Sequence, residues 1–277
     1  MNRTMPERTH LEILLAALEE FGADHPICDF SYAELSGANL TSANLDGAIL
    51  FGARLSDARL SDARLTGARL NGAILNDTDL SGANLTGVNL RDARLTGAIL
   101  FDVNLSGADM SDANLTGARL NGAILDDAKL DGANMTGAVL DDTDLADATL
   151  TGAILSGAQV TDAKLYRADL SGADMSGANL TGAILTGADL CGAILRGTYL
   201  DGANLSDAKN IVAVSGLGEM RRTAYFVRHE DRIMVQAGSI FWGTTAELLE
   251  QTYQQYSDNS AYLAAVTYAE IALRRQS

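Results

Sequence analysis

The residue types that most often carry catalysis or bind metals are scarce in this sequence of 277 residues. It contains 3 histidines and 2 cysteines, and no histidine forms a metal-ligand pattern with a cysteine or an aspartate. His229, Glu230 and Asp231 are consecutive, which fits the tip of a hairpin better than a reactive site. No serine hydrolase, zinc protease or phosphate-loop signature occurs. We therefore expect no enzyme activity, no cofactor and no metal site.

Charge and composition narrow the class of partner. The chain has 36 acidic and 20 basic residues, a net charge of −16. Phosphates are repelled by such a chain, so direct binding to nucleic acid or an anionic membrane is not expected, whereas basic protein surfaces are possible partners. No stretch reaches the ~20 apolar residues of a membrane span, and no signal-peptide pattern begins the chain. Cys28 and Cys191 lie far apart, which favours free thiols and a cytoplasmic location.

A period of five residues runs through two thirds of the chain. Every fifth residue from Phe30 to Leu205 is large and apolar, and the residue two places before it is small, usually Ala. Counting in fives gives (205 − 30)/5 + 1 = 36 units. This period fits a three-residue extended piece that points Ala and Leu to one side, followed by a two-residue corner. Only a coil that always turns the same way keeps every Leu inside, so the sequence predicts a β-solenoid.

The corner positions have the composition of turns. The second corner residue is Gly in 22 units and Asp in 11. Glycine tolerates a positive φ, and aspartate can hydrogen-bond within its own turn. The residue before it is usually Ser, Thr, Asn or Asp. The corners therefore support the solenoid independently of the apolar pattern.

Units of Ala, a polar residue, Leu, a small polar residue and Gly resemble those of the pentapeptide-repeat family over residues 26–210. The resemblance implies a right-handed quadrilateral β-helix, with about 20 residues per coil and about nine coils here. Outward charges agree with that spacing, because Glu34 precedes Arg54, and Asp144 precedes Lys164, by 20 residues. A spacing of 15 gives as many attractive pairs, so the residues alone leave the number of sides open.

Both ends of the chain differ from the repeat. Residues 6–21 fit an amphipathic helix, so we expect residues 1–25 to cap the first coil. The period is lost in residues 211–277, here called the tail, which predict a small α+β domain that caps the rod or contacts partners. The expected elements are a strand at 211–214, a hairpin of 223–228 and 232–237, and helices near 245–256 and 260–274. Thr244 and Glu247 fit a capping box at the first helix.

Two groups of residues are candidate interaction sites. Residues 31–105 contain 8 acidic and 6 basic residues, whereas residues 106–210 contain 15 and 6. Seven aspartates crowd the later coils, although a solvated surface with turn-capping aspartates is the simpler interpretation. They are Asp126, Asp127, Asp131, Asp141, Asp142, Asp144 and Asp147. The second group is the aromatic set of the tail: Trp242, Tyr253, Tyr256, Tyr262 and Tyr268.

These features predict a non-enzymatic structural or interaction protein, a rigid acidic rod whose tail contacts a protein partner or a second copy as a homodimer. The alternative comes from the resemblance, because some family members inhibit DNA gyrase by mimicking DNA. The net charge agrees with mimicry. Four outward arginines that would girdle one early coil (Arg54, Arg59, Arg64 and Arg69) depart from it. A minor alternative, a phage virion or assembly component, depends only on the appearance of the tail.

Overall fold

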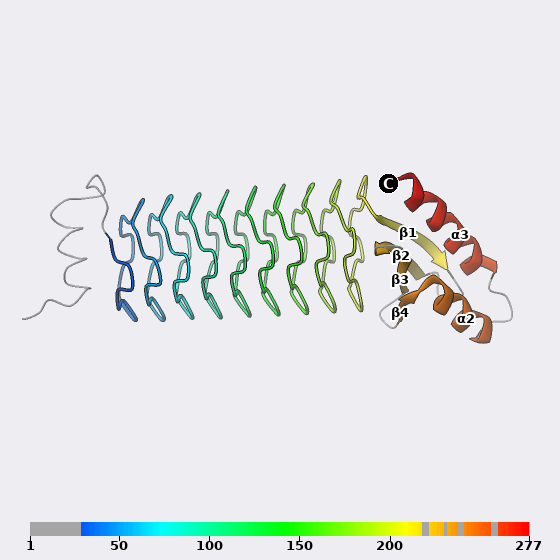
Figure 1. Ribbon diagram of the computed structural model, residues 1–277, viewed down its shortest axis with the longest axis horizontal. Coiled ribbons are helices and arrows are strands. Elements are labelled where there is room, and N and C mark those ends of the chain that lie inside the picture. Colours follow the sequence, from blue (N-terminus) through cyan, green and yellow to red (C-terminus); the bar gives the residue numbers. More distant parts are fainter. Residues whose placement is uncertain (1–28, 218–221, 230–231, 238–240, 256–259, 277) are drawn as a thin grey trace, which may run out of the picture.

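The computed structural model describes residues 29–217, 222–229, 232–237, 241–255 and 260–276. The helix expected over residues 6–21, Cys28 and Tyr256 lie outside these ranges. Within them the chain forms a long rod of stacked coils, followed at its C-terminal end by a small sheet and two helices (Figure 1). No helix among the described residues has the length and apolar character that crossing a membrane requires.

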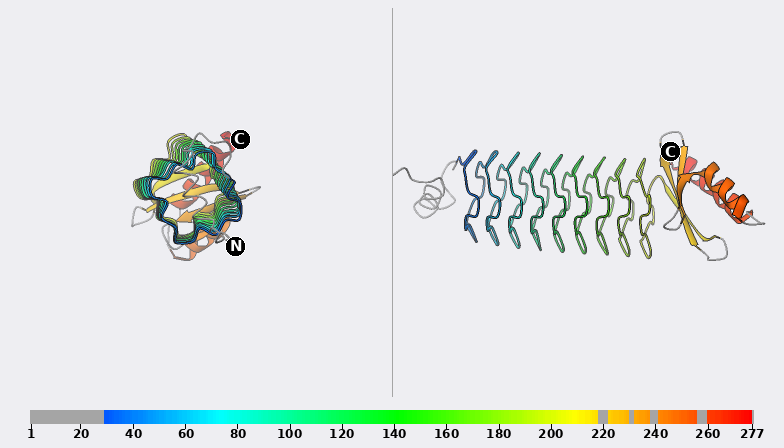
Figure 2. Two further views of the ribbon diagram at one scale, coloured as in Figure 1. Left: turned by 90° about the vertical axis from the view of Figure 1, so that its left-hand side faces the viewer. Right: turned by 90° about the horizontal axis from the view of Figure 1, so that it is seen from below.

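Each coil of the rod is built from four units. The middle residue of a unit forms a parallel bridge with the residue 20 positions later, from Asp29 with Ile49 to Asp189 with Lys209. Twenty residues divided by five give four sides, the number that the residues alone left open, and Figure 2 shows the four-sided outline from the end. The N–H of Leu50 donates to the carbonyl of Arg69 one coil on, at 2.7 Å, and this bond recurs along the rod.

The corners have the backbone that their composition predicts. All (207 − 32)/5 + 1 = 36 second corner residues have a positive φ, between 52° and 72°. Glycine and aspartate account for 33 of them, and the exceptions are Tyr32, Ser42 and Arg167. The next residue closes the turn, as when the N–H of Ala53 donates to the carbonyl of Leu50 at 3.0 Å. One left-handed residue per corner therefore turns the chain the same way each time.

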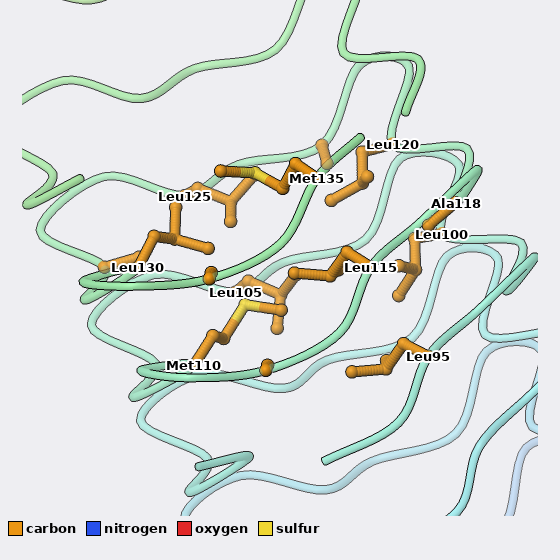
Figure 3. Packing of buried hydrophobic residues seen from close by; sticks show 14 of the residues in the cluster. Leu95, Leu100, Leu105, Met110, Leu115, Ala118, Leu120, Leu125, Leu130 and Met135 are labelled. Carbon is orange, nitrogen blue, oxygen red and sulfur yellow. The ribbon is translucent and has the colours of Figure 1, made fainter. Parts of the chain in front are cut away.

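Layers of apolar side chains fill the rod (Figure 3). Side chains 20 residues apart stack in columns along the rod. One column contains Leu95, Leu115 and Met135, each with an exposure of 0%. Threonine replaces the inward alanine three times, and each hydroxyl donates to a carbonyl in the preceding coil. These bonds join Thr78 to Leu55, Thr143 to Leu120, and Thr198 to Met175, at 2.7, 3.0 and 2.8 Å. The buried polar groups of these units are thus satisfied.

The tail holds an antiparallel sheet of order β1-β2-β3-β4 and two helices. The expected hairpin is formed by β2 and β3, and both expected helices are present, whereas the fourth strand was not expected. The elements are β1 Ile211–Leu217, β2 Arg222–His229, β3 Arg232–Ala237, β4 Phe241–Thr244, α2 Thr245–Gln255 and α3 Ser260–Arg275.

The sheet lies between the last coil and the two helices (Figure 2). Strand β2 shows this by alternation, because Tyr225 and Val227 pack on the rod core while Ala224 and Phe226 pack with the helices. Hydrogen bonds join the two parts. The N–H of Gly192 donates to the carbonyl of Arg228 at 2.7 Å, and the N–H of Gly197 donates to Oε1 of the buried Gln236 at 3.0 Å. The tail therefore closes the C-terminal end of the rod.

Candidate interaction surfaces

Six of the seven candidate aspartates lie on one side of the rod. Asp144 is the middle residue of a unit, stacked between Ile124 and Lys164. The corner before this unit holds Asp141 and Asp142. The corner after it holds Asp147, with Asp126 and Asp127 stacked one coil earlier, where the N–H of Asp127 donates to the carbonyl of Ala146. We call these six residues the acidic side. The seventh, Asp131, lies one face further round the rod.

Basic residues one coil later pair with two members of the acidic side. The Arg167 guanidinium donates to both carboxylate oxygens of Asp147, through Nε at 2.7 Å and through Nη2. These hydrogen bonds hold the pKa of Asp147 below its ordinary value. Lys164 Nζ lies 3.3 Å from Asp144 Oδ2. Asp127 and Asp142 are exposed corner residues, so they are the carboxylates best placed to meet a cation from outside.

Two of the remaining carboxylates also support the stacking of coils. Asp126 accepts a hydrogen bond from the hydroxyl of Ser106, and Asp141 accepts one from the N–H of Thr161 at 2.9 Å. Asp144 also caps its own turn, because its Oδ1 accepts the N–H of Ala146 at 3.2 Å, so turn capping and coil stacking explain part of the cluster. Asp127 and Asp142 occupy left-handed corner positions, with φ of 57° and 59°, and their carboxylates are left exposed.

The opposite corner of the rod carries no charge over five consecutive coils. Residues ten apart are half a coil apart, so residue 136 lies diagonally across from Asp126. On that corner, five consecutive coils present Ser or Thr followed by Gly. These residues are Thr96, Thr116, Thr136, Ser156 and Ser176. The acidic side therefore has no charged counterpart on this corner in these coils.

The four arginines of the girdle occupy the four faces of one early coil, as expected. Arg54, Arg59, Arg64 and Arg69 are bridging residues of consecutive units, and all four are exposed. Arg54 pairs with Glu34 at 3.2 Å, and Arg64 pairs with Asp46 at 2.5 Å. The negative surface of the rod is therefore interrupted before the acidic side begins.

The aromatic candidates of the tail divide into two kinds. Trp242 packs against the rod core and Tyr262 against the core of the tail, so these two have a structural role. Tyr253 on α2 and Tyr268 on α3 are 76% and 60% exposed. His229 ends β2 and pairs with Arg232, which begins β3, as a hairpin requires, whereas Glu230 and Asp231 lie outside the described residues. The described residues contain no group of three His, Cys, Asp or Glu that could hold a metal ion.

Sequence reasoning missed two exposed apolar residues on α3. Leu263 and Ile271 are 53% and 49% exposed. They lie opposite the buried face of α3, which is made by Ala265, Val266, Ala269 and Leu273. The signal available was their spacing of eight residues, about two helical turns.

The repeats of this chain match a known protein family. The family described as pentapeptide repeats matches in eight copies over residues 28–67, 63–100, 98–137, 143–182 and 173–209. The solved structure of HetL, a pentapeptide repeat protein involved in heterocyst differentiation regulation in the cyanobacterium Nostoc sp. strain PCC 7120, is 36% identical. That match covers 71% of this chain and 93% of HetL, with a TM-score of 0.37. No curated protein matches the chain.

Two further solved structures are similar. QnrB1, a plasmid-mediated fluoroquinolone resistance protein, is 18% identical over 66% of this chain and 87% of its own, with a TM-score of 0.42. A pentapeptide repeat protein of the Arabidopsis thaliana thylakoid lumen is 33% identical over 35% of this chain and 65% of its own, with a TM-score of 0.28. The family matches stop at residue 209 and leave the tail uncovered. This chain belongs to the pentapeptide-repeat family, and its rod is the right-handed β-helix of that family.

Proposed function

We propose that this protein is a non-enzymatic interaction protein, a rigid rod of 36/4 = 9 coils that holds two contact surfaces. One surface is the acidic side, and the other is the outer face of the tail. The observation that carries the proposal is the grouping of six aspartates on one side of the later coils, diagonally across from a corner that is uncharged over five coils. The free thiol of Cys191 supports a reducing, cytoplasmic location.

The chemistry of the acidic side favours a basic protein partner. Its exposed carboxylates attract lysine and arginine and repel phosphates. A single exposed ion pair contributes at most about 1 kcal/mol, so binding requires several pairs at once. Such pairs are screened by salt, so we expect affinity to fall as ionic strength rises.

Substitution of the acidic side tests this proposal. The variant Asp126→Asn, Asp127→Asn, Asp141→Asn and Asp142→Asn removes four charges while keeping an acceptor oxygen, and asparagine tolerates the positive φ of the corners. The matched control removes four corner aspartates from other sides of the rod: Asp57, Asp77, Asp92 and Asp112, each to Asn. Immobilised wild type and control should capture the same protein from an extract of the source cells. The acidic-side variant should lose it, and equal capture by both variants would contradict the proposal.

A second candidate function is modulation of DNA gyrase by DNA mimicry. The acidic side favours it in the later coils, and the arginine girdle opposes it in the early coils. Supercoiling by purified gyrase, with and without a fluoroquinolone, is the direct assay. A mimic should change supercoiling or drug sensitivity, and the acidic-side variant should lose this effect while the control keeps it. If wild type has no effect, the gyrase candidate is removed and the more general proposal stands.

A further inference from the structure

The outward face of α3 is an apolar surface at the far end of the molecule. Leu263, Thr267 and Ile271 follow one another at intervals of four residues, so they lie along one line of the helix. All three are exposed, and Tyr268 beside them is 60% exposed. The sheet covers the other side of α3 and lies between this helix and the coils of the rod (Figure 1). Nothing among the described residues of the same chain covers this outward face.

Charge limits which macromolecule this face can meet. Residues 29–210 have 24 acidic and 12 basic residues, net −12, whereas the tail has 7 acidic and 6 basic, net −1. Two acidic rods repel each other along their lengths. None of the exposed residues of α3 is acidic, since Glu270 at the border of this face is half-buried, and the last turn ends in Arg274 and Arg275. This face is therefore the apolar surface at which two copies approach with the least repulsion.

The spacing along α3 is self-complementary. We propose that two copies pair through antiparallel α3 helices, with the twofold axis at Thr267; this rests on the proposed role of the tail as a contact surface. Leu263 and Ile271 each stand four residues from Thr267, so this register places Leu263 of one copy against Ile271 of the other, twice. The Thr267 hydroxyl donates to the carbonyl of Leu263 at 2.9 Å, so it needs no partner across the axis. Such an isologous contact closes as a dimer.

The mass in solution tests the pairing. Sedimentation velocity should show 2 × 29.1 kDa = 58.2 kDa for the full chain. The variant Leu263→Ser with Ile271→Ser should return to the monomer mass. The matched control, Ile124→Ser with Ile154→Ser, changes two rod residues of similar exposure, 42% and 38%, and should leave the dimer intact. A wild type that stays monomeric at every concentration, or a control that dissociates equally, overturns the proposal.

Disulfide trapping tests the register. In a chain carrying Cys28→Ser and Cys191→Ser, the variant Thr267→Cys should form a covalent dimer on mild oxidation, because the two copies of residue 267 meet at the axis. Ser260→Cys is the control. It stands seven residues from the axis, so its two copies lie about 21 Å apart at the helical rise, beyond the ~7 Å limit for Cα atoms of a disulfide. Equal cross-linking of both variants would exclude the proposed register.

These outcomes are separable from those of the proposed function. The trapping and mass experiments use no other protein, and the acidic-side variant leaves α3 unchanged. Loss of capture with an intact dimer would count against the acidic side alone. A monomeric wild type that still captures its partner through the acidic side would count against the α3 pairing alone.

Discussion

Each corner of the rod needs one residue with a positive φ, and this requirement decides which side chains the repeat accepts there. A left-handed conformation costs an ordinary residue about 1–2 kcal/mol, and glycine avoids that cost. The two bulkiest exceptions have compensating contacts. The Tyr32 ring packs edge-on against Phe51, with centroids 5.3 Å apart, and Arg167 pairs with Asp147.

Two glycines on the rod separate the cost of φ from the cost of crowding. Gly117 and Gly122 have φ of 65° and 69°, but a Cβ at residue 117 would meet nothing within 4 Å, whereas one at residue 122 would lie 2.5 Å from Asp102 Oδ1. Gly117→Ala should therefore lower the free energy of unfolding by about 1 kcal/mol, and Gly122→Ala by more. Urea unfolding measures both. Adding Asp102→Gly to Gly122→Ala removes the crowding carboxylate, and glycine adds no backbone cost at residue 102, whose φ is 52°. The loss should then be no larger than that of Gly117→Ala, and equal losses for the two single variants would contradict the crowding.

Asp109 tests how the serines of the repeat stabilise the negative charge. Burial acts to raise the pKa of Asp109. Hydrogen bonds from the hydroxyl and N–H of Ser111, together with the charges of Lys129 and Arg91, outweigh this effect, so the folded pKa lies below its ordinary value of 3.8. A lowered folded pKa contributes stability above the unfolded value, and this contribution is lost as pH falls through the folded pKa. Ser111→Ala should raise the pKa of Asp109 and reduce stability at neutral pH, with the difference shrinking in acid.

Carboxyl NMR titration measures the pKa, and unfolding at several pH values measures the linkage. Ser81→Ala should repeat the result at Asp79, which has the same arrangement. A stability difference that is independent of pH would show that Ser111 acts through packing instead.

At the scale of elements, the repeat and the tail obey different rules. Every unit of the rod repeats the same local requirements, an inward Ala, an inward Leu and a left-handed corner, so the sequence alone locates all 36 units. The number of sides depends on contacts between residues 20 apart, and outward charges such as Arg64 and Asp79 matched a spacing of 15 equally well. In the structure Arg64 bridges Asn84 instead.

The candidate sites were predictable only in part. The stretch of acidic residues is visible in the sequence, but its restriction to one side follows only from four units per coil. Strand β4 is four residues long and includes Gly243, so its composition does not predict a strand. Its extended conformation depends on pairing with β3. Leu263 and Ile271 could not be told from the buried residues of α3 without knowing which face the sheet covers.

The start of α2 has a capping box that the sequence predicts. The N–H of Thr244 donates to Glu247 Oε2 at 2.7 Å, and the N–H of Glu247 donates to Thr244 Oγ1 at 3.3 Å. Thr244→Ala should destabilise α2 by about 1 kcal/mol. Hydrogen exchange should then speed up for the amides of α2 and stay unchanged in the coils around Asp126. The control is Glu250→Ala, at an exposed residue of α2 outside the capping box. Amide exchange in this variant should match that of wild type.

At the scale of the whole molecule, the rod depends on what closes its ends. An uncapped solenoid exposes unpaired strand edges and its apolar core at each end, and both associate readily with other chains. At the C-terminal end, Ile211, Val227 and Trp242 pack against the rod core, and the carbonyl of Arg228 accepts the N–H of Gly192. The inner face of the sheet is therefore part of the rod's own structure, and only the outer layer of the tail is available for partners.

This division of the tail predicts the result of truncation. A chain ending at residue 210 should keep the β-rich circular dichroism of the coils but aggregate, because it exposes the core around Leu200 that Tyr225 and Trp242 border. The full-length variant with Leu263→Ser and Ile271→Ser should stay soluble, since it changes the outer layer alone. Light scattering on the two samples separates loss of the cap from loss of a contact surface. A soluble, monodisperse truncated rod would show instead that the last coil is stable without the sheet, and that the tail is an appended contact module.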